Sequence, residues 1–93
     1  MNASRHLHFE WDEAKAKSNE HKHTVRFTLA LSVFRQDHST AEERWIALGL
    51  AATGVLLVVV YTWTEVDQKN VNVRIISARR ASAAEQRVYE DSL

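Results

Sequence analysis

Short stretches along the chain, either alternating between hydrophobic and polar residues or continuously apolar, predict β-strands. Near the N-terminus, Leu7, Phe9 and Trp11 alternate with two histidines and a glutamate. Another stretch, Val55 to Tyr61, is apolar at every position, as expected of a strand with large side chains on both faces. In order, strands are predicted around Leu7 to Trp11, Arg35 to Ser39, Arg44 to Ala51, Val55 to Trp63 and Val71 to Ser77, with a polar turn at Asp67 to Asn70.

Two helices are predicted from signals at their first residues. Asp12 is a suitable N-cap for a polar, exposed helix from about Glu13 to His21. Ser82 and Glu85 form the Ser-x-x-Glu pattern of a capping box, which predicts a C-terminal helix from about Ala83 to Asp91.

Another helix, from about Phe27 to Phe34, is predicted because its apolar residues recur every three or four positions. That spacing should place its apolar face on the sheet. Consecutive strands joined by short connections should pair antiparallel. The predicted fold class is therefore α+β, a small, mostly antiparallel sheet with helices packed chiefly on one face.

The twenty residues from Trp45 to Thr64 carry no charge and have a tryptophan near each end. This length and this placement of aromatics also fit a membrane-spanning helix. However, Thr53-Gly54 divides the run, and its second part is rich in β-branched valine. Two strands and a turn are therefore the main prediction, and a small membrane protein spanning residues 45–64 is an alternative.

Composition indicates one domain over residues 1–93, because a chain of 93 residues that is 45% hydrophobic can supply one modest core. The chain has no cysteine and no apolar N-terminal run typical of a secretory signal, so a cytoplasmic location is expected. Twelve basic and twelve acidic residues cancel. Any nucleic-acid site must therefore be a local basic patch.

Arg79 and Arg80 lie just before the predicted C-terminal helix. A helix N-terminus presents unpaired N–H groups and a partial positive charge, so two arginines beside it favour a phosphate or carboxylate. This pattern predicts an anion site. Two solvated surface arginines are the alternative.

Several separated motifs together resemble the BrnT family, toxins of type II toxin–antitoxin systems with a RelE/ParE-like ribonuclease fold. They are, in order, Phe9-Glu-Trp-Asp12 with Lys15 and Asn19, Lys22-His23-x-Val25-x-Phe27, Glu43-Arg44-Trp45 leading to Leu48-Gly49, and Val73 to Ala81. The resemblance covers about Phe9 to Tyr89. Thr24 replaces a usual glycine, and Thr64 stands where many relatives have arginine.

The resemblance implies an endoribonuclease that cleaves RNA and thereby inhibits translation and growth. Cleavage without a metal needs groups that transfer protons and cations around the phosphate. His23 is the acid–base candidate, because imidazole titrates near neutral pH, and Lys22 can hold a phosphate. The candidate catalytic residues are His23, Lys22, Arg44, Arg74 and Arg79, and the candidate RNA-binding residues are Arg80, Trp45 and Trp63.

Each of these assignments has a structural alternative. His23 can simply end the first helix and bond a backbone carbonyl, and Arg74 can form an ion pair with Glu43 or Glu65. At least one of Trp45 and Trp63 is expected to pack in the core. The histidines form no recognisable zinc-ligand set, so neither a metal nor a cofactor is expected.

The resemblance also implies a protein partner, a BrnA-like antitoxin with a ribbon-helix-helix DNA-binding domain. Two toxins would assemble with two antitoxins, and the complex would contact DNA only through the antitoxin. No membrane is expected as a partner. A non-catalytic binding module of the same fold is the alternative function, favoured by the neutral net charge and by Thr64.

Overall fold

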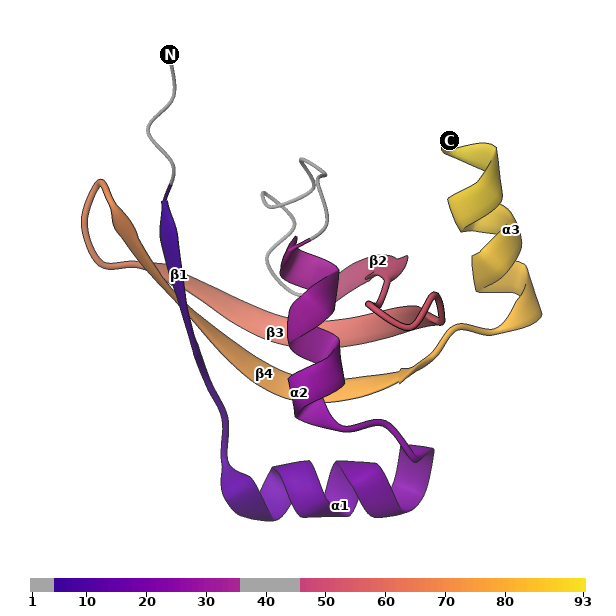
Figure 1. Cartoon of the computed structure of the whole chain (residues 1–93), viewed down its shortest axis with the longest axis horizontal. Coiled ribbons are helices and arrows are strands. Elements are labelled where there is room, and N and C mark those ends of the chain that lie inside the picture. Colours follow the sequence, from indigo (N-terminus) through magenta and orange to yellow (C-terminus); the bar gives the residue numbers. More distant parts are fainter. Residues whose placement is uncertain (1–4, 36–45) are drawn as a thin grey trace.

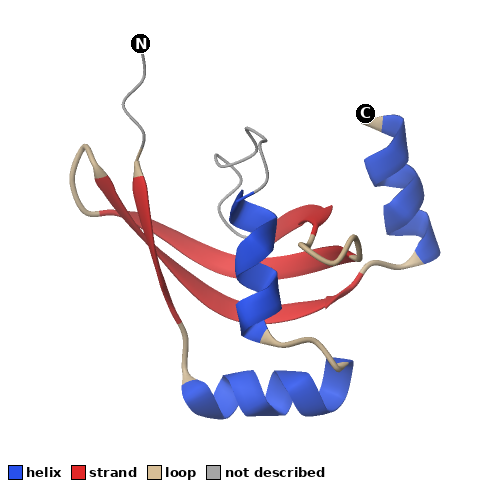
Figure 2. Cartoon of the chain, in the orientation of Figure 1, coloured by secondary structure: helices blue, strands red, loops and turns tan. Residues whose placement is uncertain are grey.

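The computed structural model describes residues 5–35 and 46–93, which form a four-stranded sheet with helices around it (Figures 1 and 2). The strands are β1 (His6–Glu10), β2 (Ile46–Leu50), β3 (Leu56–Glu65) and β4 (Asn70–Arg80), in the spatial order β1-β4-β3-β2. β2 and β4 pair antiparallel with β3, as predicted for consecutive strands, whereas β1 pairs parallel with β4. The sheet is therefore mixed, where the sequence predicted a mostly antiparallel one.

The uncharged run that resembled a membrane span forms two strands over its described residues. β2 and most of β3 lie within it, and a turn at Ala51–Gly54 joins them, with a hydrogen bond from the Gly54 N–H to the Ala51 carbonyl. Gly54 has φ +87°, a conformation that glycine adopts without strain. In the described part of the chain, no helix is long and apolar enough to cross a membrane. The membrane-spanning helix is thus replaced by a hairpin.

The helices are α1 (Glu13–His23), α2 (Phe27–Ala30), the 3₁₀ helix η1 (Leu31–Arg35) and α3 (Ala83–Asp91). Both predicted caps are confirmed: the Asp12 side chain accepts from the backbone N–H groups of Ala14 and Lys15, and Ser82 and Glu85 form a reciprocal capping box.

The second predicted helix changes to 3₁₀ geometry at its midpoint, where α2 ends and η1 begins. Arg35, the first residue of a predicted strand, ends η1 instead, and residues 36–39 of that strand lie outside the described residues.

One face of the sheet carries the hydrophobic core, and α2 with η1 crosses it (Figure 1). Phe34 of η1 packs edge-on against Tyr61 of β3, with ring centroids 4.9 Å apart, and also contacts Phe9 of β1. The approach to β2 is close, because a Cβ built on Gly49 would lie 3.0 Å from Cγ1 of Val33. The core therefore fixes the N-terminal half of the chain on β2, β3 and β4.

A β-bulge in β4 decides which side chains face away from this core. Val60 pairs with Ser77, but the next residue of β3, Tyr61, pairs with Ile75, so Ile76 is an extra residue in β4. The side-chain alternation shifts by one at this point. Arg74 and Arg79, five positions apart, consequently share the outer face, where a regular strand would place them on opposite faces.

Asn19 of α1, only 6% exposed, attaches the helix to the edge of β4. β1 pairs with β4 only as far as Arg74, and beyond that point the Asn19 side chain takes the place of a strand. Its Nδ2 donates to the Ala78 carbonyl at 2.8 Å, and its Oδ1 accepts from the Ala78 N–H at 3.1 Å. Nδ2 also donates to the Val25 carbonyl at 2.9 Å, which fixes the chain as it leaves α1.

Asn19→Ala should lower the free energy of unfolding by about 3 kcal/mol, because it leaves the Ala78 N–H and two buried carbonyls without these partners, at roughly 1–3 kcal/mol for each unsatisfied group. Urea unfolding measures this loss. Ser18→Ala, at an exposed position beside it, is the matched control and should change stability little. A loss below about 1 kcal/mol for Asn19→Ala would contradict this role.

Candidate functional site

A hollow of about 170 Å³ lies between α1 and the edge of β4. Two residues predicted to act in catalysis, Lys22 and His23, line it from the last turn of α1, and Ser77 lines it from β4. The complete lining is Lys15, Ser18, Asn19, Lys22, His23, Ile76 and Ser77. Cations therefore gather on the side where Asn19 attaches the helix to the strand.

The last turn of α1 ends at Thr24, which has φ 56° and ψ 29° and thus adopts the left-handed conformation that glycine most often supplies at a helix C-terminus. The Thr24 N–H donates to the Glu20 carbonyl and closes the helix there. Lys22 and His23 are exposed just before it, at the negative end of the helix dipole, which favours positive charge. The His23 ring makes no hydrogen bond with any other described residue, so it is accessible to a ligand.

Arg74 lies on the outer face of β4 and forms an ion pair with Glu10 of β1, Nη1 to Oε2, at 3.2 Å. From the sequence, the structural alternative for Arg74 was an ion pair with Glu43 or Glu65. Glu65 instead binds Arg5 at 2.7 Å, and Glu43 lies outside the described residues. The Arg74 side chain is 44% exposed, so the ion pair is accessible from solvent.

Arg79, on the same face, binds Glu85 of α3 through two parallel hydrogen bonds, both 2.8 Å long. These bonds, followed by the Ser82 N–H, lower the pKa of Glu85 from 4.5 to about 2, and the same contact raises the pKa of Arg79. The carboxylate thus occupies the position beside the helix N-terminus where the sequence predicted an anion. The chain supplies this anion itself.

Arg80 does not extend the Arg79 site. Arg80 pairs across the sheet with Leu57 and Arg79 pairs with Val58, so their side chains leave opposite faces of β4. Arg80 lines a different hollow, of about 520 Å³, between α3 and the hairpin of β2 and β3, with Leu50 and Tyr89. The structure therefore separates the two arginines that the sequence grouped together.

Trp63 packs against the hydrophobic core on the face opposite Arg74 and Arg79, with the Arg5 guanidinium 5.8 Å from its ring centroid. This agrees with the expectation that at least one of the two tryptophans packs in the core. Arg44 and Trp45 lie outside the described residues, so their predicted roles stay predictions.

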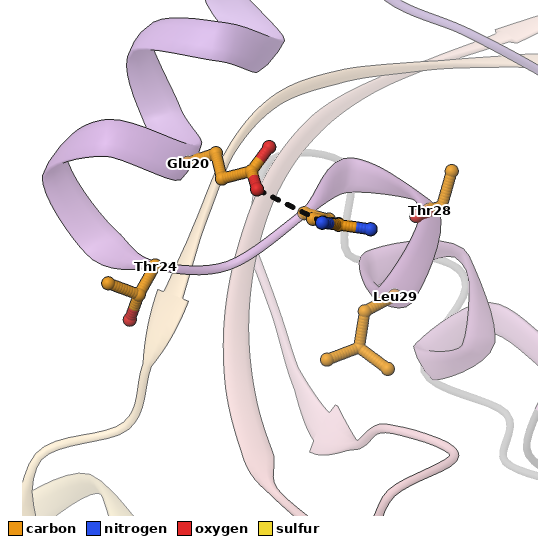
Figure 3. Close-up of a pocket in the computed structure, with 5 residues that line it drawn as sticks. Glu20, Thr24, Thr28 and Leu29 are labelled. Carbon is orange, nitrogen blue, oxygen red and sulfur yellow. Dashed lines mark hydrogen bonds and ion pairs between the residues drawn. The ribbon is translucent and has the colours of Figure 1, made fainter.

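A third hollow, of about 560 Å³, opens where α1 passes into α2 (Figure 3). The Arg26 Nε donates to Glu20 Oε2 at 3.0 Å across it, and Thr24, Thr28 and Leu29 complete the lining. No residue predicted to act in catalysis or RNA binding lines this hollow.

The sequence assigned no role to Lys15, Ser18 or Ser77, which the structure brings to Lys22 and His23. Positions 15, 18, 19 and 22 follow helical spacing and share one face of α1. Because the helix is polar on all sides, this face could not be distinguished from the others in the sequence. Ser77 gave no local signal, because its position depends on how β4 meets α1.

The Arg79–Glu85 pair should make stability depend on pH at the acid end. Because the folded pKa of Glu85 is about 2 and its ordinary value is 4.5, the contribution is complete above about pH 4.5 and is lost as pH falls through about 2. Glu85→Gln retains an acceptor for the Ser82 N–H but has no charge.

The difference in melting temperature between the original protein and Glu85→Gln should therefore be largest at neutral pH and shrink as the solution is acidified. Thermal scans across pH measure it, with Glu90→Gln on the same helix as the control. Parallel curves for the original protein and Glu85→Gln at all pH values would refute the prediction.

Comparison with known proteins supports one family. Residues 11–85 match the sequence model of the ribonuclease toxin BrnT of type II toxin–antitoxin systems. Among solved structures, the chain is similar to the Brucella abortus ribonuclease toxin BrnT, known from a crystal structure at 1.1 Å resolution. The two sequences are 26% identical, and the TM-score is 0.49. The match covers 80% of this chain and 95% of the Brucella chain. No curated protein matches. Because the family model spans most of the 93 residues, the chain belongs to the BrnT family of ribonuclease toxins of type II toxin–antitoxin systems.

Proposed function

We propose that this protein is an endoribonuclease toxin that cleaves cytoplasmic RNA without a metal ion and so arrests translation and growth until an antitoxin covers it. The observation that carries the proposal is the hollow beside β4, where His23 and two lysines meet with no carboxylate in the lining. An anionic RNA backbone is the ligand that such a lining favours. Membership of the BrnT family supports the same reaction class.

In the proposed chemistry, an RNA 2′-hydroxyl gives its proton to His23 and its oxygen attacks the adjacent phosphorus. The P–O5′ bond breaks, the 5′-oxygen gains a proton, and a 2′,3′-cyclic phosphate remains on the other fragment. His23 then returns a proton to the 5′-oxygen, because an imidazole can both accept and donate a proton. Lys22 is adjacent in the same hollow and stabilises the added negative charge on the phosphate.

Arg74 and Arg79 are proposed to hold the RNA along the outer face of β4, on either side of Ser77 in the sequence. Both now bind carboxylates, Glu10 and Glu85, whose positions RNA phosphates can take. The Arg74–Glu10 pair is exposed, and exposed ion pairs contribute little to stability, so exchange there costs little. The Arg79–Glu85 pair is half-buried and bidentate, so a phosphate at Arg79 has to replace both of its hydrogen bonds.

A second candidate is a binding module of the same fold that has lost cleavage. It is favoured by the same two ion pairs, because Arg74 and Arg79 are both engaged within the chain. An assay for RNA cleavage separates the two functions.

Purified protein incubated with RNA should release fragments that end in a 2′,3′-cyclic phosphate, at equal rates with and without a chelator. His23→Ala and Arg79→Ala should each abolish cleavage and growth arrest. Gel analysis and end-group mass spectrometry measure the products.

His21→Ala is the matched control, because His21 is exposed on the same helix and does not line the hollow. Circular dichroism confirms that each variant is folded. Activity that disappears in chelator and returns with magnesium would refute the metal-free mechanism, and full activity of folded His23→Ala would refute its catalytic role.

The partner is proposed to be a BrnA-like antitoxin with a ribbon-helix-helix DNA-binding domain, in a complex of two toxins and two antitoxins. The outer face of the sheet has exposed apolar residues on β2, with Ile46 56% and Leu50 38% exposed, and the two arginines on β4. An antitoxin with apolar and acidic side chains can cover both parts and exclude RNA.

If one face serves both ligands, Arg74→Glu should weaken RNA cleavage and antitoxin binding together. Calorimetry with the antitoxin and the RNA assay measure the two effects, and the original complex should survive high salt because apolar contacts contribute to it. Arg26→Glu, which lies away from this face, is the control. Loss of cleavage with unchanged antitoxin affinity would show that the surfaces are separate.

A further inference from the structure

Lys15 has no role in the proposed chemistry, yet it lies at the same hollow as Lys22 and His23. The two lysines are seven residues apart on α1, which is two helical turns or about 10 Å along the axis. Asn19 lies between them and is fixed to Ala78 by two hydrogen bonds. The orientation of α1 about its own axis is thereby set, and both lysines are held at the edge of β4.

Two carboxylates near these lysines in the sequence are used elsewhere. Asp12 caps the first turn of α1, and Glu20 binds Arg26 on the side of the helix that faces the hollow in Figure 3. None of the residues that line the hollow beside β4 is acidic. Among the described residues, neither lysine has a carboxylate within ion-pair distance, in contrast to Arg74 and Arg79.

Two hydroxyl groups complete the lining, Ser18 from α1 and Ser77 from β4. A hydroxyl donates to an anionic oxygen at low cost because its hydrogen rotates. Neither hydroxyl makes a hydrogen bond within the described part of the chain. Two ammonium groups and two free hydroxyls around one hollow form a set of donors that suits a phosphate group.

We propose that Lys15, with Ser18 and Ser77, forms a phosphate subsite that holds the RNA backbone phosphate next to the one that is cleaved at Lys22 and His23. This proposal rests on the proposed function. Ser77 lies between Arg74 and Arg79 in β4, so an RNA strand that follows the outer face of β4 can continue into the hollow at this serine. Lys15 thus fixes the position of the strand and transfers no proton.

The test uses a short single-stranded oligonucleotide with 2′-O-methyl groups, which lacks the attacking hydroxyl and cannot be cleaved by the proposed route. Fluorescence anisotropy at several salt concentrations gives its dissociation constant. Lys15→Ala should weaken binding roughly fivefold to tenfold at low salt and reduce the slope of log K against log salt by about 0.7, the value for one lost contact to a single strand. Lys15→Arg should restore most of the affinity.

Lys17→Ala is the matched control, because it removes the same charge from the same helix at a position that does not line the hollow. A loss in Lys17→Ala equal to that in Lys15→Ala would overturn the subsite, since it would show only a general effect of charge. Unchanged affinity in folded Lys15→Ala would overturn it too.

Titration with inorganic phosphate, followed by NMR, keeps the subsite distinct from the proposed function. Phosphate, but not chloride, should shift the amide resonances of Ser18 and Ser77 in the original protein and not in Lys15→Ala. If the protein binds no oligonucleotide yet shows these shifts, the phosphate subsite stands and the RNA function fails. Absence of the shifts in the original protein overturns the subsite.

Discussion

The amide of Asn19 controls the arrangement on which the candidate site depends. Its two hydrogen bonds to Ala78 continue the sheet with a side chain where β1 has already ended, and its third bond fixes the backbone at Val25. A buried amide group costs free energy when its hydrogen bonds are lost, so α1 has one preferred position and orientation on β4. This orientation determines which face of α1 contacts β4, and it therefore places Lys22 and His23 beside Ser77.

The distribution of charge follows from the same arrangement. The chain is neutral overall, so its basic character must be local. On the outer face of the sheet, arginines and glutamates from different elements neutralise one another, as in the Arg74–Glu10 and Arg79–Glu85 pairs. The hollow beside α1 has no such acidic lining. Positive potential is therefore concentrated where the proposed chemistry needs it, while exchangeable pairs lie next to it.

Local signals predicted a large part of the fold. The capping box at Ser82 and Glu85 and the cap at Asp12 depend on residues two or three positions apart, and both helices begin where predicted. The runs that became β2 and β3 were recognisable from the Thr53-Gly54 break between them and the β-branched valines of the second run. The direction of β1 was not, because its partner strand lies more than sixty residues later in the chain. For the candidate site, the sequence proposed Lys22 and His23 but could not associate them with Ser77.

The sequence by itself determined the family, the starts of α1 and α3 and the hairpin between β2 and β3, since each depends on motifs or on neighbours in the chain. Tertiary structure alone decided which charges meet. A one-residue bulge at Ile76 turned Arg79 to the face of Arg74, and the parallel pairing of β1 gave Arg74 its partner Glu10. The register of distant strands depends on core packing and not on local preference. For this reason, the composition of the candidate site became visible only in the folded chain.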